Sequence, residues 1–224
     1  MAAERLPIEQ FRALDVAGVC RHTFIKRIQG VDVSHNKSEA LSRLETAHRD
    51  IRRATGMGDW PLLTAEQIHG NKIAIVDTPV ESDEHFAACD GLIINQPRIA
   101  LGIYVADCCA VYIVDPKIPA IGLVHSGRRG TELGVVTTAI TRMAQCFGSD
   151  PAKLIVQLSP CIRPPHYEID LAEKIVEQCR VQGVEEIHDS GVCTACNLNA
   201  YYSYRAEKGR TGRMLALLAL AANT

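Results

Sequence analysis

Three short apolar runs between residues 100 and 130 form the most regular stretch of the sequence. They are rich in Val and Ile, and polar segments at 107–109 and 115–119 separate them. Short apolar runs bounded by turn residues predict buried strands. The reactive side chains of this stretch therefore fall at predicted strand ends, where His125 precedes a segment that contains Gly and Arg.

Helical spacing of apolar residues appears in other parts of the chain. Residues 39–55 are predicted to form an amphipathic helix that stops at Gly56. A second helix is expected to run from Thr131, as its cap, to residue 147, with Gly148 as its stop. Two more helices are expected over residues 170–179 and 211–221.

The remaining apolar segments predict strands, at residues 22–27, 61–69, 72–77, 89–94 and 154–158. The strands on either side of Gly70 are expected to pair as a hairpin. Because strands and helices do not alternate regularly, the predicted fold class is α+β, with mixed β-sheets and flanking helices. The length of 224 residues and the lack of a linker predict a single domain over residues 1–224.

Composition and charge narrow the possible functions. The chain is 47% hydrophobic and 22% charged, as is typical of globular proteins, and its formal net charge is −2. A nearly neutral chain has no electrostatic field to attract nucleic acid or an anionic membrane, so we expect neither partner. Nine cysteines, an odd number, occur without an apparent export signal, which favours free thiols and a cytoplasmic location.

His69, Cys108 and His125 are the candidate reactive centre. Each lies at or near the end of an apolar run. Two imidazoles and a thiolate form a sound ligand set for zinc, and they leave a fourth position open for water or substrate. Spacing alone equally allows hydrogen-bonded histidines and a buried cysteine that bind no metal.

Nine short motifs, in this order along nearly the whole chain, resemble those of the laccase-domain family. They are HTFIKR (22–27), QIHG (67–70), DGLII (90–94), VADCC (105–109), HSGRRGT (125–131), SPCI (159–162), YEID (167–170), SYR (203–205) and TGRM (211–214). That family was first described as multicopper polyphenol oxidases and is regarded as purine nucleoside phosphorylases with adenosine deaminase activity. The resemblance implies that His69, Cys108 and His125 are metal ligands. It also implies a fold related to that of the cytotoxic necrotizing factor toxins, which are cysteine hydrolases.

The chain departs from the family pattern at several positions. Arg128 stands where the family usually has Trp, and Cys109-Ala110 follow the motif where it usually has Pro. The family's Asn-rich segment is not recognisable between Gly30 and Glu39. If that segment contacts the nucleoside, we expect an altered substrate preference or a loss of activity.

Four arginines are candidates for contacts with phosphate or substrate. Arg129 follows His125 and lies near a predicted helix N-terminus, where backbone N–H groups favour an anion. Arg27, Arg205 and Arg213 are candidates by their place in the motifs alone. Arg128 is interpreted as a solvated side chain or as a change at the pocket rim.

The remaining candidate residues are one aspartate and three cysteines. Asp107 is expected to orient a neighbour of the metal ligands or to cap a turn. Period-two alternation predicts that Cys109 points to the opposite face from Cys108. Cys193 and Cys196 form a C-x-x-C pair, but no second pair completes a zinc site, so a structural role is favoured.

The sequence therefore predicts a cytoplasmic, zinc-dependent enzyme that acts on purine nucleosides and phosphate, with copper as an alternative metal. The alternative enzyme is a metal-free hydrolase or deamidase with Cys108 as the nucleophile and His125 as the base. A catalytically silent binding protein is a third hypothesis. Copper-dependent phenol oxidation is disfavoured, because multicopper oxidases need many more clustered histidines.

Overall fold

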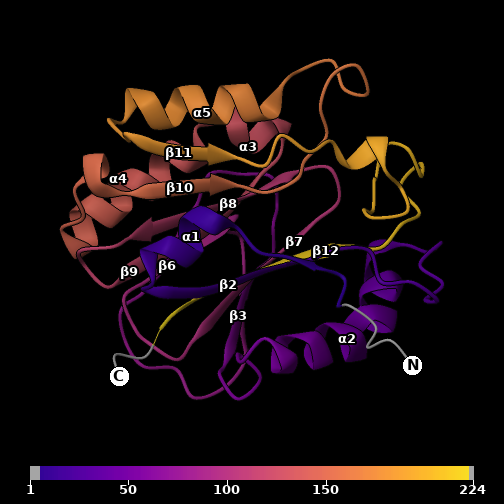
Figure 1. Cartoon of the computed structure of the whole chain (residues 1–224), viewed down its shortest axis with the longest axis horizontal. Helices are drawn as coiled ribbons and strands as arrows, with labels where there is room; N and C mark the ends of the chain where they lie inside the picture. Colours follow the sequence, from indigo (N-terminus) through magenta and orange to yellow (C-terminus); the bar gives the residue numbers. More distant parts are fainter. Residues whose placement is uncertain (1–5, 222–224) are drawn as a thin grey trace.

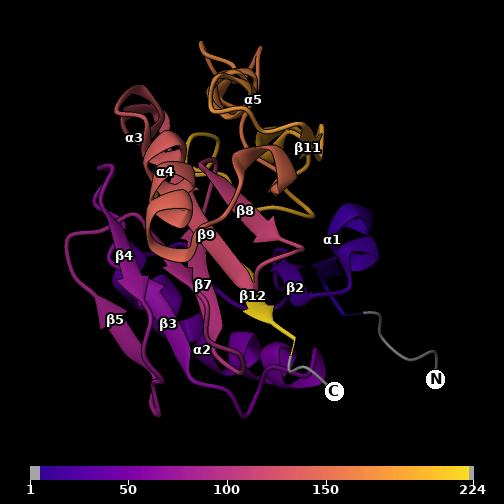
Figure 2. The same ribbon diagram turned by 90° about the vertical axis from the view of Figure 1, so that its left-hand side faces the viewer.

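The computed structural model describes residues 6–221, in which two six-stranded sheets face each other (Figures 1 and 2). In order across the first sheet lie β1 (Ile8–Glu9), β2 (Cys20–Ile25), β12 (Met214–Leu220), β7 (Ala100–Val105), β3 (Leu62–Ala65) and β5 (Glu84–Phe86). Across the second lie β11 (Glu186–Asp189), β10 (Ile155–Leu158), β8 (Cys109–Asp115), β9 (Ala120–Ser126), β6 (Gly91–Ile94) and β4 (Ile73–Val76). Each sheet contains parallel and antiparallel pairs, which confirms the predicted α+β class with mixed sheets.

The helices lie on the outer faces of the two sheets, apart from the first, which packs against β2 and β10 and places Leu14 between the sheets. They are α1 (Arg12–Ala17), α2 (Lys37–Ala54), α3 (Arg128–Glu132), α4 (Val135–Phe147) and α5 (Leu171–Val181). In both views α2 lies beside the first sheet, whereas α4 and α5 lie on the far side of the second (Figures 1 and 2). Among residues 6–221, no helix combines the length and apolarity needed to cross a bilayer.

The buried apolar residues follow this layering. The largest cluster lies between the sheets and includes Tyr112 of β8 and Leu218 of β12. A second cluster fills the space between the second sheet and helices α4 and α5. A third packs Ile51 of α2 and Met57 against the outer face of the first sheet. Strands at the centre of each sheet are therefore buried on both faces.

Double-sided burial explains one wrong prediction. Residues 211–221 were expected to form a helix, but Met214–Leu220 is the strand β12, paired with both β2 and β7. Alternate residues of β12 enter the cluster between the sheets and the cluster below α2. A strand buried on both faces is continuously apolar, so it has no polar period to distinguish it from a buried helix.

The predicted hairpin around Gly70 is also wrong. Strand β3 ends at Ala65 and pairs with β5 and β7 in the first sheet, whereas β4 pairs with β6 in the second. Residues 66–72 therefore carry the chain from one sheet to the other. Gln67 and His69 both have a positive φ in this crossing, 64° and 60°, so it is an irregular turn.

The helix expected from Thr131 is divided in two. Helix α3 begins after Gly127, and Gly134, at φ 72°, separates it from α4. The Thr131 hydroxyl lies inside α3, donates to the Gly127 carbonyl and does not act as a cap. The predicted end at Gly148 is confirmed, and α5 follows Asp170, whose side chain accepts from the backbone N–H of Glu173.

The other predicted elements are present with shifted ends, whereas β1, β5 and β11 were not predicted from the sequence. The three strands predicted between residues 100 and 130 are β7, β8 and β9. The helix expected over 39–55 begins two residues earlier, where the Asn36 side chain caps it. Helix α1 had no sequence signal, because six residues give too little periodicity to detect. All nine cysteines are free thiols, as expected.

Candidate metal centre

Two turns and the end of a strand bring His69, Cys108 and His125 together. His69 lies in the crossing from β3 to β4, Cys108 in the tight turn between β7 and β8, and His125 near the end of β9. Their ligand atoms, one from each residue, all lie within 4.8 Å of one another. Within residues 6–221, no other group of three His, Cys, Asp or Glu side chains meets this criterion.

The geometry suits a small tetrahedral ion. Cys108 Sγ lies 4.0 Å from His69 Nε2, and the two imidazole rings meet nearly at right angles, at 81°. Around a zinc ion, nitrogen and sulfur ligands at their usual bond lengths are separated by about 3.5 Å. The Cys108–His69 pair therefore needs to contract by about half an ångström to hold such an ion, and a pair at the 4.8 Å limit of the cluster by about 1.3 Å.

Asp90 fixes two of the three candidate ligands, and the sequence did not reveal this role. Its carboxylate is fully buried and lies 2.9 Å from His125 Nδ1. The same carboxylate accepts hydrogen bonds from the backbone N–H groups of His69, at 2.8 Å, and Gly70, at 2.6 Å. When His125 donates from Nδ1, its Nε2 is left free as a metal ligand, an arrangement common in metalloproteins. Only a position at the start of the DGLII motif hinted at this residue.

Gln67 holds the same crossing at its other end. Its side-chain amide donates to the Tyr104 carbonyl at 2.5 Å and accepts from the Tyr104 N–H at 3.0 Å. The amide thus replaces a strand neighbour along β7. Because a positive φ is unfavourable for side chains such as Gln67 and His69, these contacts stabilise a turn that is otherwise strained.

The charges of Cys108 and His125 stabilise each other. Burial raises the pKa of the Cys108 thiol, but the charge of His125 and hydrogen bonds from both histidines outweigh it, so this pKa falls to about 6. Burial lowers the pKa of His125, but the Cys108 thiolate and the Asp90 hydrogen bond raise it to about 9. A thiolate is the form in which cysteine binds metals and acts as a nucleophile.

Gly127 leaves room for the cluster. A β-carbon on this residue would lie 2.7 Å from Cys108 Sγ and 3.1 Å from His69 Cδ2. Its φ of −94° is open to any residue, so the requirement for glycine here is one of space. The backbone therefore forms a close wall behind the sulfur.

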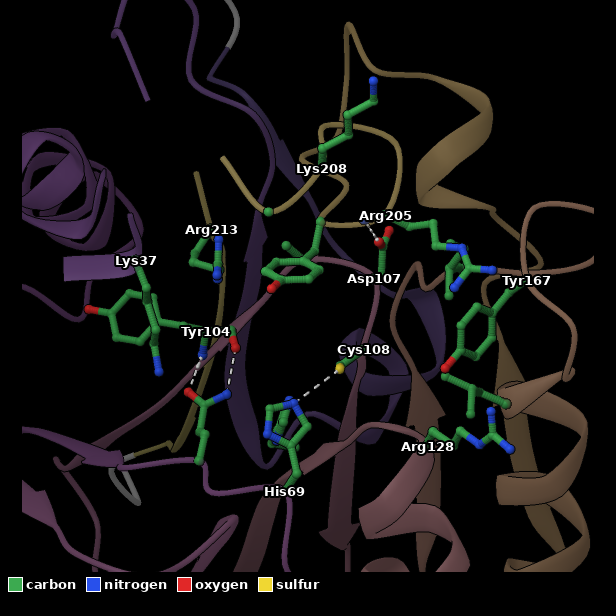
Figure 3. A pocket seen from close by; sticks show the side chains of 17 residues that line it. Lys37, His69, Tyr104, Asp107, Cys108, Arg128, Tyr167, Arg205, Lys208 and Arg213 are labelled. Atoms are coloured by element: carbon green, nitrogen blue, oxygen red, sulfur yellow. Dashed lines mark hydrogen bonds between the residues drawn. The ribbon is translucent and has the colours of Figure 1, made fainter. Parts of the chain in front are cut away.

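The three residues line a cavity of about 610 Å³ (Figure 3). Its remaining lining residues are Lys37, Gln67, Tyr104, Ala106, Asp107, Arg128, Ile162, Tyr167, Leu171, Tyr204, Arg205, Lys208, Gly209 and Arg213. Five of these side chains are basic, whereas Asp107 is the one carboxylate among the described lining residues. The volume suits a small organic molecule, and the charges favour an anion.

The structure separates the candidate arginines. Arg205 and Arg213 line the cavity. Arg27 is not among the lining residues; it is paired with Glu207 at 2.7 Å. Arg129 is exposed on α3 and does not line the cavity either, whereas its neighbour Arg128 does. An anion bound at Arg129, as the sequence predicted, would therefore lie outside this cavity.

Asp107 connects the cysteine turn to two later loops. Its carboxylate accepts from the Thr194 hydroxyl and from the Arg205 N–H, both at 2.7 Å. These bonds tie the turn that carries Cys108 to the two loops, and the expected orienting role of Asp107 stays a prediction. Cys193 precedes a short 3-10 helix that carries Thr194 and ends at Cys196, in agreement with a structural role.

The sequence and fold can be compared with those of known proteins. The family model described as multi-copper polyphenol oxidoreductase laccase matches residues 17–172 and 165–221. A Streptomyces griseus protein named purine nucleoside phosphorylase ORF3 is 25% identical, over 92% of this chain and 97% of its own length. Purine nucleoside phosphorylase YlmD of Bacillus subtilis is 23% identical, over 74% of this chain and 72% of its own.

Solved structures share the fold. YlmD from Geobacillus stearothermophilus superposes with a TM-score of 0.82 at 20% identity, over 97% of this chain and all of that chain. Neisseria meningitidis protein NMB0706 gives a TM-score of 0.76 at 19% identity, over 91% of this chain and 95% of that one. With the family match over nearly the whole described chain, these findings show that the protein belongs to the multi-copper polyphenol oxidoreductase laccase family.

Proposed function

We propose that this protein is a zinc-dependent purine nucleoside phosphorylase. The observation that carries the proposal is the cluster of His69, Cys108 and His125 on the wall of a cavity with five basic side chains. Relatives that match most of the chain are named purine nucleoside phosphorylases, which supports the same substrates. A single domain over residues 1–224 and a cytoplasmic location are part of the proposal.

The cavity offers separate surfaces for the two substrates. Ile162, Tyr167 and Leu171 supply apolar and aromatic surface on which a purine can pack. The basic side chains supply N–H donors for phosphate. A nucleoside and a phosphate ion bound together would place the sugar between these surfaces.

The reaction replaces one bond at the sugar. A phosphate oxygen forms a bond to the anomeric carbon, and the bond from that carbon to the purine nitrogen breaks. The electron pair leaves with the base, which takes up the proton that the phosphate gives up, and the products are ribose 1-phosphate and free purine. A zinc ion held by the cluster would act as a Lewis acid toward a substrate oxygen.

Protein residues contribute position and charge to this reaction. Asp90 and Gln67 hold the His69 turn, and Asp90 orients His125. Basic side chains balance the charge of phosphate while it approaches the sugar. Positioning of two reactants in this way supplies much of the rate enhancement of a two-substrate enzyme.

Adenosine deamination is the second activity in the proposal, by analogy with the family that the motifs resemble. It requires a group that moves protons near the metal centre. Asp107 is the described carboxylate of the cavity, and both its oxygens already accept hydrogen bonds. We therefore expect phosphorolysis to be the stronger of the two activities.

Metal analysis and product detection test the proposal together. We expect freshly purified protein to hold about one zinc ion per chain, as three protein ligands imply. It should release hypoxanthine from inosine only when phosphate is present, and the His69→Ala variant should lose both zinc and activity. Protein that contains zinc but forms neither free purine nor ammonia would overturn the proposal and favour a binding protein. Copper together with phenol oxidation would favour the oxidase.

A metal-free cysteine hydrolase is the rival function, because Cys108 is held as a thiolate beside His125. The expected relation to the toxin-like hydrolase fold belongs to this hypothesis. Iodoacetamide should modify Cys108 rapidly in a metal-free enzyme and slowly when zinc occupies the sulfur. Rapid modification of Cys108 in protein that is fully active without metal would favour the hydrolase. Protection of Cys108 by zinc would favour the phosphorylase.

A further inference from the structure

Four of the five basic side chains of the cavity fall into two groups with different partners, whereas the fifth, Lys208, points away from the centre of the cavity in Figure 3. Arg128 and Arg205 share one carboxylate: Arg128 Nη1 lies 3.1 Å from Glu168 Oε1, and Arg205 Nη2 lies 3.2 Å from Glu168 Oε2. Arg128 also contacts Glu132 at 3.1 Å. These arginines join three segments of chain at the cavity rim, and their charges are largely balanced.

Lys37 and Arg213 form the other group, and they differ in having no such balance. Within residues 6–221, neither side chain has a carboxylate oxygen within 4.0 Å. Arg213 is only 9% exposed, and its Nη1 donates to the carbonyls of Thr211 and Gly212, both at 2.9 Å. These carbonyls are neutral, so they satisfy N–H groups without cancelling the positive charge.

The two charges disfavour each other. Burial, followed by the charge of Arg213, lowers the pKa of Lys37. Burial also lowers the pKa of Arg213. Negative groups offset part of this cost, Glu66 and Asp90 at Lys37 and Cys108 and Asp107 at Arg213. Because none of these carboxylates lies within ion-pair distance, a bound anion would stabilise both cations further.

Lys37 and Arg213 lie on one side of the cavity, so an anion bound to both would lie there. Lys37 is the first residue of α2, and Arg213 directly precedes β12. Figure 3 shows both on the side of the cavity near Tyr104, with Arg128, Arg205 and Tyr167 on the other side and the His69–Cys108 contact between them. An anion beside Lys37 and Arg213 would thus lie across the cavity from the aromatic surface.

We propose that Lys37 and Arg213 form an oxyanion subsite that binds a phosphate group, with the purine held at the opposite end by Ile162, Tyr167 and Leu171. This inference rests on the proposed function for its substrates, and it adds the orientation in which they bind. The phosphate group belongs either to inorganic phosphate or to a nucleotide. Both sources use the same chemistry, that of a doubly charged oxyanion between an ammonium and a guanidinium.

Direct binding measurements test the subsite without relying on catalysis. Inorganic phosphate, adenosine and adenosine monophosphate are titrated by calorimetry into the wild-type protein, Lys37→Gln and Arg213→Lys, each checked for equal zinc content. Lys37 is exposed overall, although its ammonium group is partly desolvated at the cavity, so Lys37→Gln should fold normally. Lys26→Gln is the matched control, because Lys26 pairs with Glu9 and does not line this cavity.

Loss of one charged contact should weaken phosphate binding about tenfold or more. Lys37→Gln should therefore raise the dissociation constant for inorganic phosphate, and the KM for phosphate, by at least this factor. Binding of adenosine should change less than about threefold, and Lys26→Gln should behave as the wild type. Arg213→Lys keeps the charge but loses the planar fork, so it should weaken phosphate binding as well.

The outcomes separate the subsite from the proposed function. If Lys37→Gln weakens adenosine monophosphate but not inorganic phosphate, the subsite takes the phosphate of a nucleotide. If neither variant weakens either ligand, the subsite is wrong, even if phosphorolysis is observed. If phosphate binds in a Lys37-dependent way but no ribose 1-phosphate forms, the subsite stands and the proposed function fails.

Discussion

The region around Cys108 and the region around Cys109 are separated by one peptide bond, yet they differ in burial, charge and chemistry. Cys108 is half-buried in the cavity wall, and its sulfur faces two histidines. Cys109 begins β8 and is fully buried, with its sulfur 3.8 Å from the Ser159 carbonyl and 3.9 Å from the Ser159 hydroxyl. Cys109 belongs to the apolar cluster below α4 and α5.

The pKa values of the two thiols move in opposite directions. Burial, with a hydrogen bond and charge from Cys161, raises the pKa of Cys109 well above its ordinary value. Burial acts on Cys108 in the same sense, but the neighbouring imidazoles lower its pKa to about 6. Burial alone therefore does not make a cysteine reactive, whereas a positive charge close to the sulfur does.

Replacement of Cys108 should give the largest effect, because it removes a candidate ligand. We expect Cys108→Ala to lose zinc and to lower kcat/KM by more than about 100-fold, beyond the effect typical of residues that merely support a ligand. Zinc content by elemental analysis and the rate of purine release check this. A Cys108→Ala variant that keeps both zinc and activity would show that the sulfur binds no metal.

Asp90→Asn should have the next largest effect, because it alters the hydrogen bonds that hold two candidate ligands, His69 and His125. In this variant an amide nitrogen would face N–H groups that now donate hydrogen bonds to the carboxylate. His69 and His125 would therefore be held less firmly. Loss of such support typically weakens metal binding 10–100-fold. Zinc affinity is measured by competition with a chelator.

Asp115→Asn is the matched control for this change. Asp115 is buried at the other end of β8, where its Oδ1 accepts from the N–H groups of Lys117 and Ile118. We expect Asp115→Asn to lower the melting temperature without changing zinc affinity. Equal losses of zinc affinity in the two variants would mean that Asp90 acts only through overall stability.

The contrast between the two cysteines was partly available from the sequence. Alternation along a strand predicted that Cys109 faces away from Cys108, and the structure confirms it. The positions of His69, Cys108 and His125 at the ends of apolar runs indicated that they could converge. Local pattern left residues that bind no metal as an equal alternative, and the resemblance to a known family singled out these three side chains.

Other features depend on contacts that a local pattern does not contain. The crossing at residues 66–72 joins two sheets, and a Gly-Asn turn alone looks the same in a hairpin. Asp90 supports residues 20 and 35 positions away, at His69's neighbour Gly70 and at His125. Lys37 gains significance only because the charge of Arg213, far along the chain, acts on it across the cavity wall.

Gly127→Ala should lower zinc affinity moderately, because Gly127 lies against the Cys108 sulfur. The new methyl group would lie 2.7 Å from Cys108 Sγ, so the sulfur or the backbone must shift. We expect zinc affinity to fall about tenfold, because ligand geometry tolerates only small displacements. Gly148→Ala would strain a C-cap at φ 78° away from the cavity, so it should affect stability and leave zinc affinity unchanged.

The smallest effect should come from Cys109→Ala, on the other side of the same peptide. Its sulfur lies among apolar side chains and Ser159, so its removal leaves a small cavity and costs about 1 kcal/mol of stability. For a chain of this length such a loss lowers the melting temperature by about 2–4 °C. The Ser159 hydroxyl keeps its hydrogen bond from the Ala110 N–H, so the start of β8 should stay in place. Zinc content and kcat/KM should therefore equal those of the wild type, measured beside Cys108→Ala on the same preparation. A loss of zinc in Cys109→Ala would mean that the two faces of β8 are coupled, and that the position of the Cys108 sulfur depends on packing beneath the sheet.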